Sequence, residues 1–408
     1  MLNVGNKAKK SLLGMFILGL TATSISACGA RPDITNTSGV PDIKSLALMV
    51  VPNKDRIDVL DMQTNRVTQS LSTDQRPSNI AASPDGRMIL VTNTNSGTIS
   101  VFLRRDNDVF QQLNSIGNGL RPVGIAFNPN PSVNEAYVAY EGESKVLVLD
   151  TRDRNAAPRI IRVLNLQGAA PRKIAVSNDG TKIYVTDNSS ARLIILNRTS
   201  AASFTRNEVQ LVAGVSTTPG TNNNSINLEG LYIDQPATSG TTANSSATQT
   251  GTGRVFISNN TQDTLIVVRG NAVESTISLK DNQIVGQNQV GPRNMTVYRN
   301  PQTGTEKLYV AGYNASVISV IDVKTLRLLK NIPLTQNSGA TRESYNPVSV
   351  AVGTLASKED VIYVTNTSGL TVSLIDPASD TLKRSFSTTI SAAAQDPLGE
   401  IVTVGPIR

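Results

Sequence analysis

The fold follows from one stretch, residues 77–102, which reads PSNIAASPDGRMILVTNTNSGTISVF. Short runs of Ile, Leu, Val and Thr alternate with polar residues and are separated by Pro, Asp, Asn and Gly, the pattern of strands joined by tight turns. Pro77 suits the first residue of a strand, where its missing N–H removes no ladder hydrogen bond. Asp85-Gly86 suits a hairpin in which the Gly has a positive φ. The stretch therefore predicts three antiparallel strands.

The same unit recurs along the chain. Residues 171–196 repeat it as PRKIAVSNDGTKIYVTDNSSARLIIL, further copies begin at Pro122, Pro292 and Pro347, and a degenerate copy spans 228–268. A fourth strand is predicted after the third at Val163–Leu166, Val209–Val212, Ser275–Leu279, Leu329–Leu334 and Arg384–Ser387. Four antiparallel strands repeated every 40–55 residues or so are the signature of a β-propeller blade.

The two ends of the repeat region complete each other. The first three predicted strands are Leu46–Val51, Arg56–Asp61 and Arg66–Leu71. They lack a Pro-led inner strand, which residues 396–404 (DPLGEIVTV) supply, although Glu400 stands where other copies have Ile. We therefore expect an all-β, seven-bladed β-propeller over residues 44–408, with four-stranded antiparallel blades and a C-terminal strand that completes the first blade and leaves no open edge.

Two tetrapeptides carry a family resemblance. Tyr184-Val185-Thr186-Asp187 and Tyr363-Val364-Thr365-Asn366 resemble the YVTN-type β-propeller repeat, and the similarity covers residues 44–408. That family is found in surface-layer proteins and in secreted or lipid-anchored prokaryotic proteins. The resemblance implies an architecture much more firmly than an activity.

The composition excludes much chemistry. The 408 residues include no His and one Cys. Without imidazole there is no Ser-His or Cys-His nucleophile pair and no His-ligated metal, and one Cys allows neither an internal disulfide nor a cysteine-held zinc or iron–sulfur cluster. No run of alternating carboxylates marks a calcium loop, so we expect no metal and no cofactor. The lone acids at strand ends, which we expect to close turns, are Asp61, Asp150, Asp322 and Asp376.

The first 27 residues have the pattern of a secretory signal peptide. Three lysines precede the apolar run Ser11–Leu20, and a stretch of small residues follows it. The run is shorter than the roughly 20 apolar residues that span a bilayer. Ile25-Ser26-Ala27-Cys28 resembles the lipobox of bacterial lipoproteins, which implies cleavage before Cys28, acylation of Cys28 and membrane lipid as a partner. Gly29 in place of Asp implies the outer membrane, on its periplasmic side or at the cell surface.

The cleaved chain is expected to be tethered and close to neutral. Residues 28–43 comprise the lipidated Cys and a flexible segment rich in Thr, Asn, Pro and Gly. Removing residues 1–27 takes away three of the 38 basic side chains and none of the 31 acidic ones, which leaves a net charge of +4. So small a charge does not indicate nucleic acid as a partner.

Four arginines flank the prolines that open the inner strands. They are Arg76 and Arg121, one residue before the proline, and Arg172 and Arg293, one residue after it. Positions two apart in an extended segment point the same way, so these side chains are predicted to share one rim of the central channel and to bind an anionic group. On this hypothesis all four can be replaced by Gln without loss of stability. Alternatively, acids on the same face pair with them: Glu141, Glu143, Asp187, Glu229 and Glu343.

Longer loops add candidate binding segments. Three predicted insertions lie on the face of the arginines: Thr199–Asn227, Lys280–Gly291 and Thr335–Asn346. Gln235–Gly253, rich in Ser, Thr, Asn and Gly, is expected to be a mobile loop on the other face.

Three classes of function remain open. We expect a membrane-anchored, non-catalytic lipoprotein that serves as a binding or scaffolding platform in the bacterial cell envelope, with a protein or an anionic envelope glycan as its partner. The second class is a lactonase-like hydrolase, because Gly291-Pro292-Arg293-Asn294 resembles the GPRH segment of propeller-type lactonases, although Asn294 replaces its His. A structural component of the envelope or surface layer is the third. An assay of lactone turnover distinguishes the binding platform from the hydrolase.

Overall fold

The structure is a computed structural model. It describes residues 45–200, 203–213, 226–235, 251–281, 289–334, 345–368, 371–388 and 397–405. The predicted signal peptide, Cys28 and its tether lie outside the described residues, as do Glu343, Asp396 and the middle of each predicted insertion. None of the helices in the described ranges is long and apolar enough to cross a membrane.

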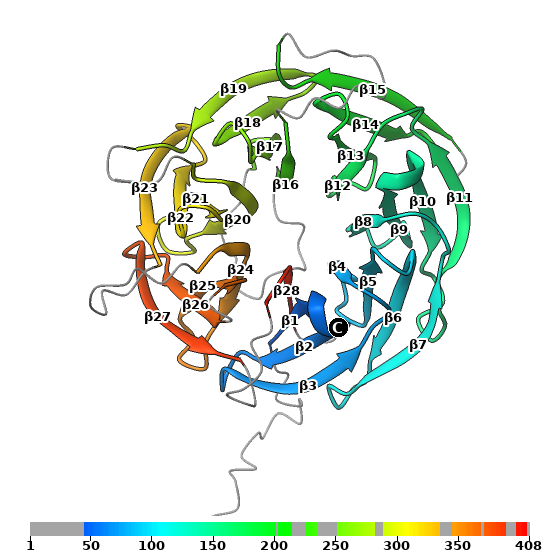
Figure 1. Ribbon diagram of the computed structural model, residues 1–408, viewed down its shortest axis with the longest axis horizontal. Helices are drawn as coiled ribbons and strands as arrows, with labels where there is room; N and C mark the ends of the chain where they lie inside the picture. The colour runs from blue at the N-terminus through cyan, green and yellow to red at the C-terminus, as the bar shows by residue number, and fades with distance from the viewer. Residues whose placement is uncertain are drawn as a thin grey trace, which may run out of the picture. The chain divides into compact units, whose positions relative to one another are not determined.

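The described residues fold into seven four-stranded antiparallel sheets, which stand side by side around a central channel (Figure 1). Each sheet is one blade, and blades 1 to 7 follow one another in chain order. The inner strand of each blade contacts the inner strands of its neighbours, and the last blade meets the first. The prediction of an all-β, seven-bladed propeller is therefore confirmed.

Within each blade, the four strands lie side by side in order from the channel to the outside. Blade 1 contains β28 (Ile401–Val404), β1 (Leu46–Val51), β2 (Arg56–Asp61) and β3 (Arg66–Ser72). Blade 2 contains β4 (Pro77–Ala82), β5 (Met88–Asn93), β6 (Thr98–Arg104) and β7 (Phe110–Ile116). Blade 3 contains β8 (Pro122–Phe127), β9 (Glu135–Tyr140), β10 (Lys145–Asp150) and β11 (Arg159–Asn165). Blade 4 contains β12 (Pro171–Val176), β13 (Lys182–Asp187), β14 (Arg192–Arg198) and β15 (Phe204–Gln210).

The remaining blades have the same order. Blade 5 contains β16 (Leu228–Asp234), β17 (Arg254–Asn259), β18 (Thr264–Arg269) and β19 (Ala272–Ser278). Blade 6 contains β20 (Pro292–Arg299), β21 (Glu306–Gly312), β22 (Val317–Asp322) and β23 (Arg327–Pro333). Blade 7 contains β24 (Pro347–Thr354), β25 (Asp360–Asn366), β26 (Thr371–Asp376) and β27 (Thr381–Ser387). Two short 3₁₀ turns, η1 (Pro52–Lys54) and η2 (Glu141–Glu143), each join the second and third strands of a blade.

Strand β28 closes the ring, as predicted from the two chain ends. It pairs antiparallel with β1, placing Val404 opposite Leu46 and Ile401 opposite Met49. The strand begins at Ile401 and not at a proline, but the contact with β1 extends further, because the Val50 N–H donates to the Glu400 carbonyl at 2.9 Å. The backbone of Glu400 is therefore held by β1.

The apolar cores lie between the blades. All six side chains of β1 are buried, and because successive residues point to opposite faces, Leu46, Leu48 and Val50 pack with blade 2 while Ala47, Met49 and Val51 pack with blade 7. Within the described ranges, one such cluster fills each junction between neighbouring blades. The chain thus distributes its apolar residues over seven small cores and needs no single large one.

Tyrosines of the repeat connect neighbouring blades. The Tyr309 hydroxyl donates to Asp380 Oδ1 at 2.6 Å on blade 7, and the Tyr363 hydroxyl donates to Asn65 Oδ1 at 3.1 Å on blade 1. Burial raises the pKa of both phenols, and at Tyr309 the bond to Asp380 raises the pKa further, so both remain neutral donors. Tyr309 and Tyr363 therefore have structural roles.

Turn chemistry follows the sequence-based expectations. Gly86 and Gly180 of the Asp-Gly turns have φ values of +69° and +74°, which residues with a Cβ rarely adopt. The strand-end acids accept hydrogen bonds from backbone N–H groups two or three residues further on: Asp61 from Gln63, Asp150 from Arg152, Asp322 from Thr325 and Asp376 from Ala378. These carboxylates close turns.

Removing the closing strand tests the architecture. A chain ending at Glu400 loses the pairing of β28 with β1 and the burial of Ile401 and Val404. We expect its free energy of unfolding to fall by at least about 3 kcal/mol. A chain ending at Gly405 keeps the strand and is the matched control. Equal urea midpoints for the two chains would contradict closure by β28.

Candidate functional site

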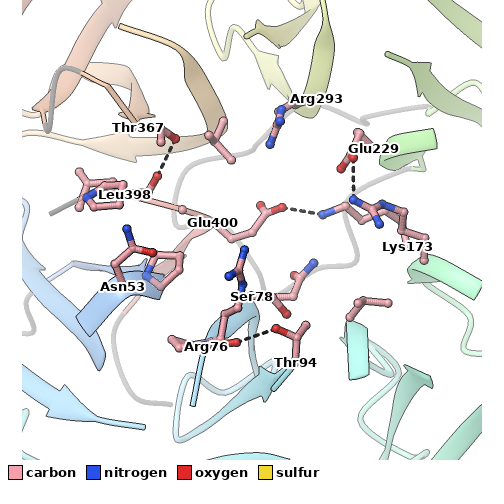
Figure 2. Close-up of a pocket in the computed structure, with 18 of the residues that line it drawn as sticks. Asn53, Arg76, Ser78, Thr94, Lys173, Glu229, Arg293, Thr367, Leu398 and Glu400 are labelled. Carbon is pink, nitrogen blue, oxygen red and sulfur yellow. Dashed lines mark hydrogen bonds and ion pairs between the residues drawn. The ribbon is translucent and has the colours of Figure 1, made fainter. Parts of the chain in front are cut away.

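A cavity of about 630 Å³ opens at one mouth of the channel, and all seven blades contribute to its wall (Figure 2). The lining residues belong to the first residues of the inner strands, to the segments just before them and to the loops between second and third strands. The charged residues among them are Arg76, Arg121, Arg172, Lys173, Arg293, Glu229 and Glu400. The structure therefore brings the four arginines together, in a cavity with five cationic side chains and two carboxylates.

Two of these arginines share an unusual backbone conformation. Arg76 and Arg121, each just before the proline that opens an inner strand, have φ values of +56° and +57°. The equivalent residues of blades 6 and 7 are Gly291 and Asn346, the two residue types that adopt this left-handed region most easily. An arginine there costs about 1 kcal/mol or more in backbone strain. The conformation at Arg76 is fixed by its N–H, which donates to Asp55 Oδ1 at 2.7 Å.

Arg172 is part of an ion-pair network between blades. Its Nη2 lies 2.6 Å from Glu229 Oε1 of blade 5, and its Nη1 lies 3.3 Å from Glu141 Oε1 of blade 3. Arg121 Nη2 also contacts Glu141, at 2.8 Å, but its side chain is 63% exposed against 27% for Arg172. Burial acts to lower the pKa of Arg172, and the charges of Glu229 and Glu141 outweigh it and raise the pKa above its usual value.

This network divides the four arginines into two kinds. Arg172 pairs with acids of neighbouring blades, which is the alternative stated in the sequence analysis. Replacing Arg172 would leave the Glu229 carboxylate buried beside fewer cations. For Arg172 these ion pairs lead us to expect a loss of stability on replacement, in place of the unchanged stability expected for all four arginines. Among the remaining acids of that alternative, Asp187 pairs with Arg192 at 2.8 Å and Glu143 with Lys145 at 2.9 Å.

The Glu229 carboxyl is held in its charged form. Burial acts to raise its pKa, but the charges of Arg172, Lys173 and Arg293 outweigh burial and keep the pKa below its usual value of 4.5. A carboxylate with a lowered pKa is a weak base, so this environment suits structural charge compensation better than proton abstraction.

Arg76 and Arg293 point into the cavity from opposite sides, from blades 2 and 6 (Figure 2). The Arg293 guanidinium stacks 3.9 Å from the centroid of the Tyr313 ring, and its buried Nε has no hydrogen-bond partner within the described part of the chain. In the same described ranges, no carboxylate forms an ion pair with the side chain of Arg76 or Arg293. These two guanidinium groups are available to an anion.

Sequence reasoning did not identify the contact at the centre of the cavity. Lys173 Nζ lies 2.5 Å from Glu400 Oε1, while Asn294 Nδ2 and Ser349 Oγ donate to Glu400 Oε2 at 2.5 and 2.8 Å (Figure 2 draws the first contact). Blades 4, 6 and 7 thus hold a carboxylate from blade 1. The sequence feature that could have indicated this contact is Glu400, which stands where other copies of the repeat have Ile. From the sequence alone this difference indicated only an irregular strand register.

The site contains no other recognisable reaction chemistry among the described residues. Asn294, at the position of the lactonase His, uses its amide group on Glu400, on Ser349 and on the Met295 N–H. In the described ranges, no three potential metal ligands gather at one place.

Comparisons with known proteins identify the architecture. No protein-family model and no curated protein sequence matches the chain. Among solved structures, it is similar to a functionally unknown protein from Desulfotomaculum acetoxidans, with 11% identity, a TM-score of 0.62, and coverage of 88% of this chain and 99% of that one. It is also similar to the periplasmic gluconolactonase of Pseudomonas aeruginosa, with 13% identity, a TM-score of 0.58, and coverage of 88% of this chain and 99% of that one. A third similar structure is AztD from Citrobacter koseri, with 15% identity, a TM-score of 0.56, and coverage of 89% of this chain and 98% of that one. At these identities the similarity concerns the fold alone: the chain is a seven-bladed propeller with an architecture similar to that of these proteins.

The assigned role of the Glu229 carboxylate predicts how the stability of the protein depends on pH. E229Q should lower the free energy of unfolding by about 1–2 kcal/mol at neutral pH, because Arg172 loses a buried partner. The folded-state pKa is lowered, so this difference is full above pH 4.5 and shrinks as pH falls below it. Urea unfolding of both proteins across that range measures it.

The matched control for this test is E359Q. Glu359 pairs with Lys383 at an exposed site, so its replacement should change stability by less than about 0.5 kcal/mol. A wild-type advantage over E229Q that grows on acidification would contradict the assigned role of Glu229.

Proposed function

We propose that this protein is a lipid-anchored, non-catalytic propeller of the cell envelope that binds an anionic group of a protein or an envelope glycan at its channel mouth. One observation carries the proposal: five cationic side chains and two carboxylates line a single cavity, and both carboxylates are already paired. Arg76 and Arg293 supply the charge that remains.

Electrostatics favours an anion as the occupant. Like charges gathered in a concave site with low-dielectric walls focus the field and raise the local concentration of counter-ions. Guanidinium groups match carboxylate and phosphate oxygens through their planar fork. Arg76 and Arg121 have the left-handed conformation that Gly291 and Asn346 have in blades 6 and 7, so the repeat itself fixes where these two side chains start.

The cavity is also pre-organised. Its cations stand on inner strands or on the residues next to them, and the Arg172 network ties three neighbouring blades together. A rigid site loses little side-chain entropy on binding, so more of the interaction energy contributes to affinity.

Binding is favoured over hydrolysis by the residues that hydrolysis would use. Asn294 has no proton-accepting nitrogen and is fully hydrogen bonded, and Glu229 has a lowered pKa and an ion pair. The shared fold with a gluconolactonase concerns architecture, which hosts many functions. A purely structural coat protein, the third class, would not require a cationic cavity.

Export and anchoring rest on the sequence of residues 1–43. The lipobox resemblance at Cys28 supplies the acyl chains, and two or more chains give stable membrane attachment where one gives a marginal one. The proposed location is the outer membrane, on its periplasmic side or at the cell surface.

Replacing the two available arginines tests the binding function. R76Q/R293Q should reduce crosslinking capture of partners from intact envelope by at least about tenfold, because each lost charge-assisted contact contributes roughly 1.5–3 kcal/mol. The melting temperature should fall only slightly, because Arg172 and Lys173 remain beside Glu229. The control, R159Q/R327Q, removes the same charge from exposed positions on β11 and β23. Equal capture by the two double variants would refute the cationic cavity as the binding site.

The anchor has its own test. C28A should move the protein from the detergent-rich to the aqueous phase on phase separation and abolish labelling by palmitate, because the acyl chains need the Cys28 thiol and the processed amine. Persistent membrane attachment of C28A would contradict lipid anchoring.

A further inference from the structure

Glu400 occupies the cavity as a ligand would. Its Oε1 contacts Lys173 Nζ at 2.5 Å, and its Oε2 accepts from Asn294 Nδ2 and Ser349 Oγ at 2.5 and 2.8 Å. The Ser349 side chain is completely buried, and Asn294 Nδ2 lies 3.0 Å from Ser349 Oγ, so the donors also orient one another. Three blades have therefore built a receptor for one planar carboxylate.

The side chain of Glu400 can leave this receptor without opening the ring. Its backbone is held separately, by the Val50 N–H on the Glu400 carbonyl at 2.9 Å and by the Gly399 N–H on the Val50 carbonyl at 2.8 Å. Closure by β28 involves residues 401–404, beyond Glu400. Occupation of the receptor and closure of the propeller are thus separable.

We propose that the ligand of this cavity is an acidic peptide segment of a partner protein, one carboxylate of which displaces Glu400 from Lys173. This inference rests on the proposed anion-binding function and specifies its ligand. The resident group is itself a glutamate side chain of a peptide, so Lys173 already pairs with the kind of carboxylate that the ligand would present. Arg76 and Arg293, which approach from either side of Glu400 in Figure 2, provide for further carboxylates of the same segment.

Competition makes the proposal measurable. The ligand binds only the fraction of molecules whose receptor has been vacated, so its apparent affinity falls by that fraction. E400Q removes the competing charge, whereas S349A removes one hydrogen bond to Glu400 and leaves the charge of the cavity unchanged. Lys173 lines the cavity whereas Ser349 and Asn294 do not, so the incoming carboxylate contacts Lys173, and S349A loosens Glu400 without removing a contact to the ligand.

The experiment measures binding of a fluorescein-labelled hexaglutamate peptide to the purified full-length protein by fluorescence anisotropy. We expect the wild type to bind, E400Q to bind about tenfold more tightly, and S349A about threefold more tightly. S373A is the matched control: Ser373 is buried in the same blade and bonds Asn366 and Ser385 rather than Glu400, so its affinity should equal that of the wild type. R76Q/R293Q should bind at least tenfold more weakly.

The binding results distinguish three claims: displacement of Glu400, a peptide as the ligand, and anion binding by the cavity. Equal affinities of wild type, E400Q and S349A, with loss of binding in R76Q/R293Q, would refute displacement of Glu400 while leaving anion binding intact. Binding of oligogalacturonate but not of hexaglutamate would refute the peptide in favour of an acidic glycan. Failure of every variant to bind either probe, with no capture from envelope, would remove the proposed function as well. If E400Q does not fold, judged by circular dichroism, the S349A result decides.

Discussion

The pairing of β28 with β1 is the constraint on which the rest of the structure depends. Every apolar core lies between two blades, so each blade is stable only with a neighbour on both sides. An open ring would expose two apolar sheet faces and leave β1, whose six residues are all buried, as an edge strand paired only with β2. A strand of four residues therefore stabilises much more surface than it covers itself.

Closure of the ring also brings cationic side chains of different blades close together at the channel mouth. The inner strands converge, so cations that are separated by many tens of residues in the chain come to line one cavity. Two glutamates compensate part of this charge in different ways. Glu229 is buried in a network with Arg172 that joins neighbouring blades, while Glu400 extends into the cavity toward Lys173 on the other side of the ring.

The same repeat position has acquired different roles in different blades. Arg172 is enclosed by carboxylates and contributes to stability, whereas Arg293 stacks on Tyr313 and forms no ion pair with a carboxylate in the described part of the chain. A repeat scaffold permits this divergence because each blade needs only its core and its turns preserved. The lactonase-like segment at Gly291–Asn294 illustrates it: the arginine remains, but the next residue is an amide that supports Glu400.

The sequence by itself determined the strands, the number of blades, the closing of the first blade by the last segment and the gathering of four arginines at one mouth. These follow from local physics: period-two alternation selects strands, Pro and Asp-Gly mark their ends, and repetition carries the pattern around the ring. Only the tertiary structure decided which arginines are neutralised, and that Glu400 is held by Lys173, Asn294 and Ser349, which precede it by 227, 106 and 51 residues. Ion pairs and hydrogen bonds depend on distances of a few ångströms, and these distances exist only after the ring has closed and brought side chains from different blades together.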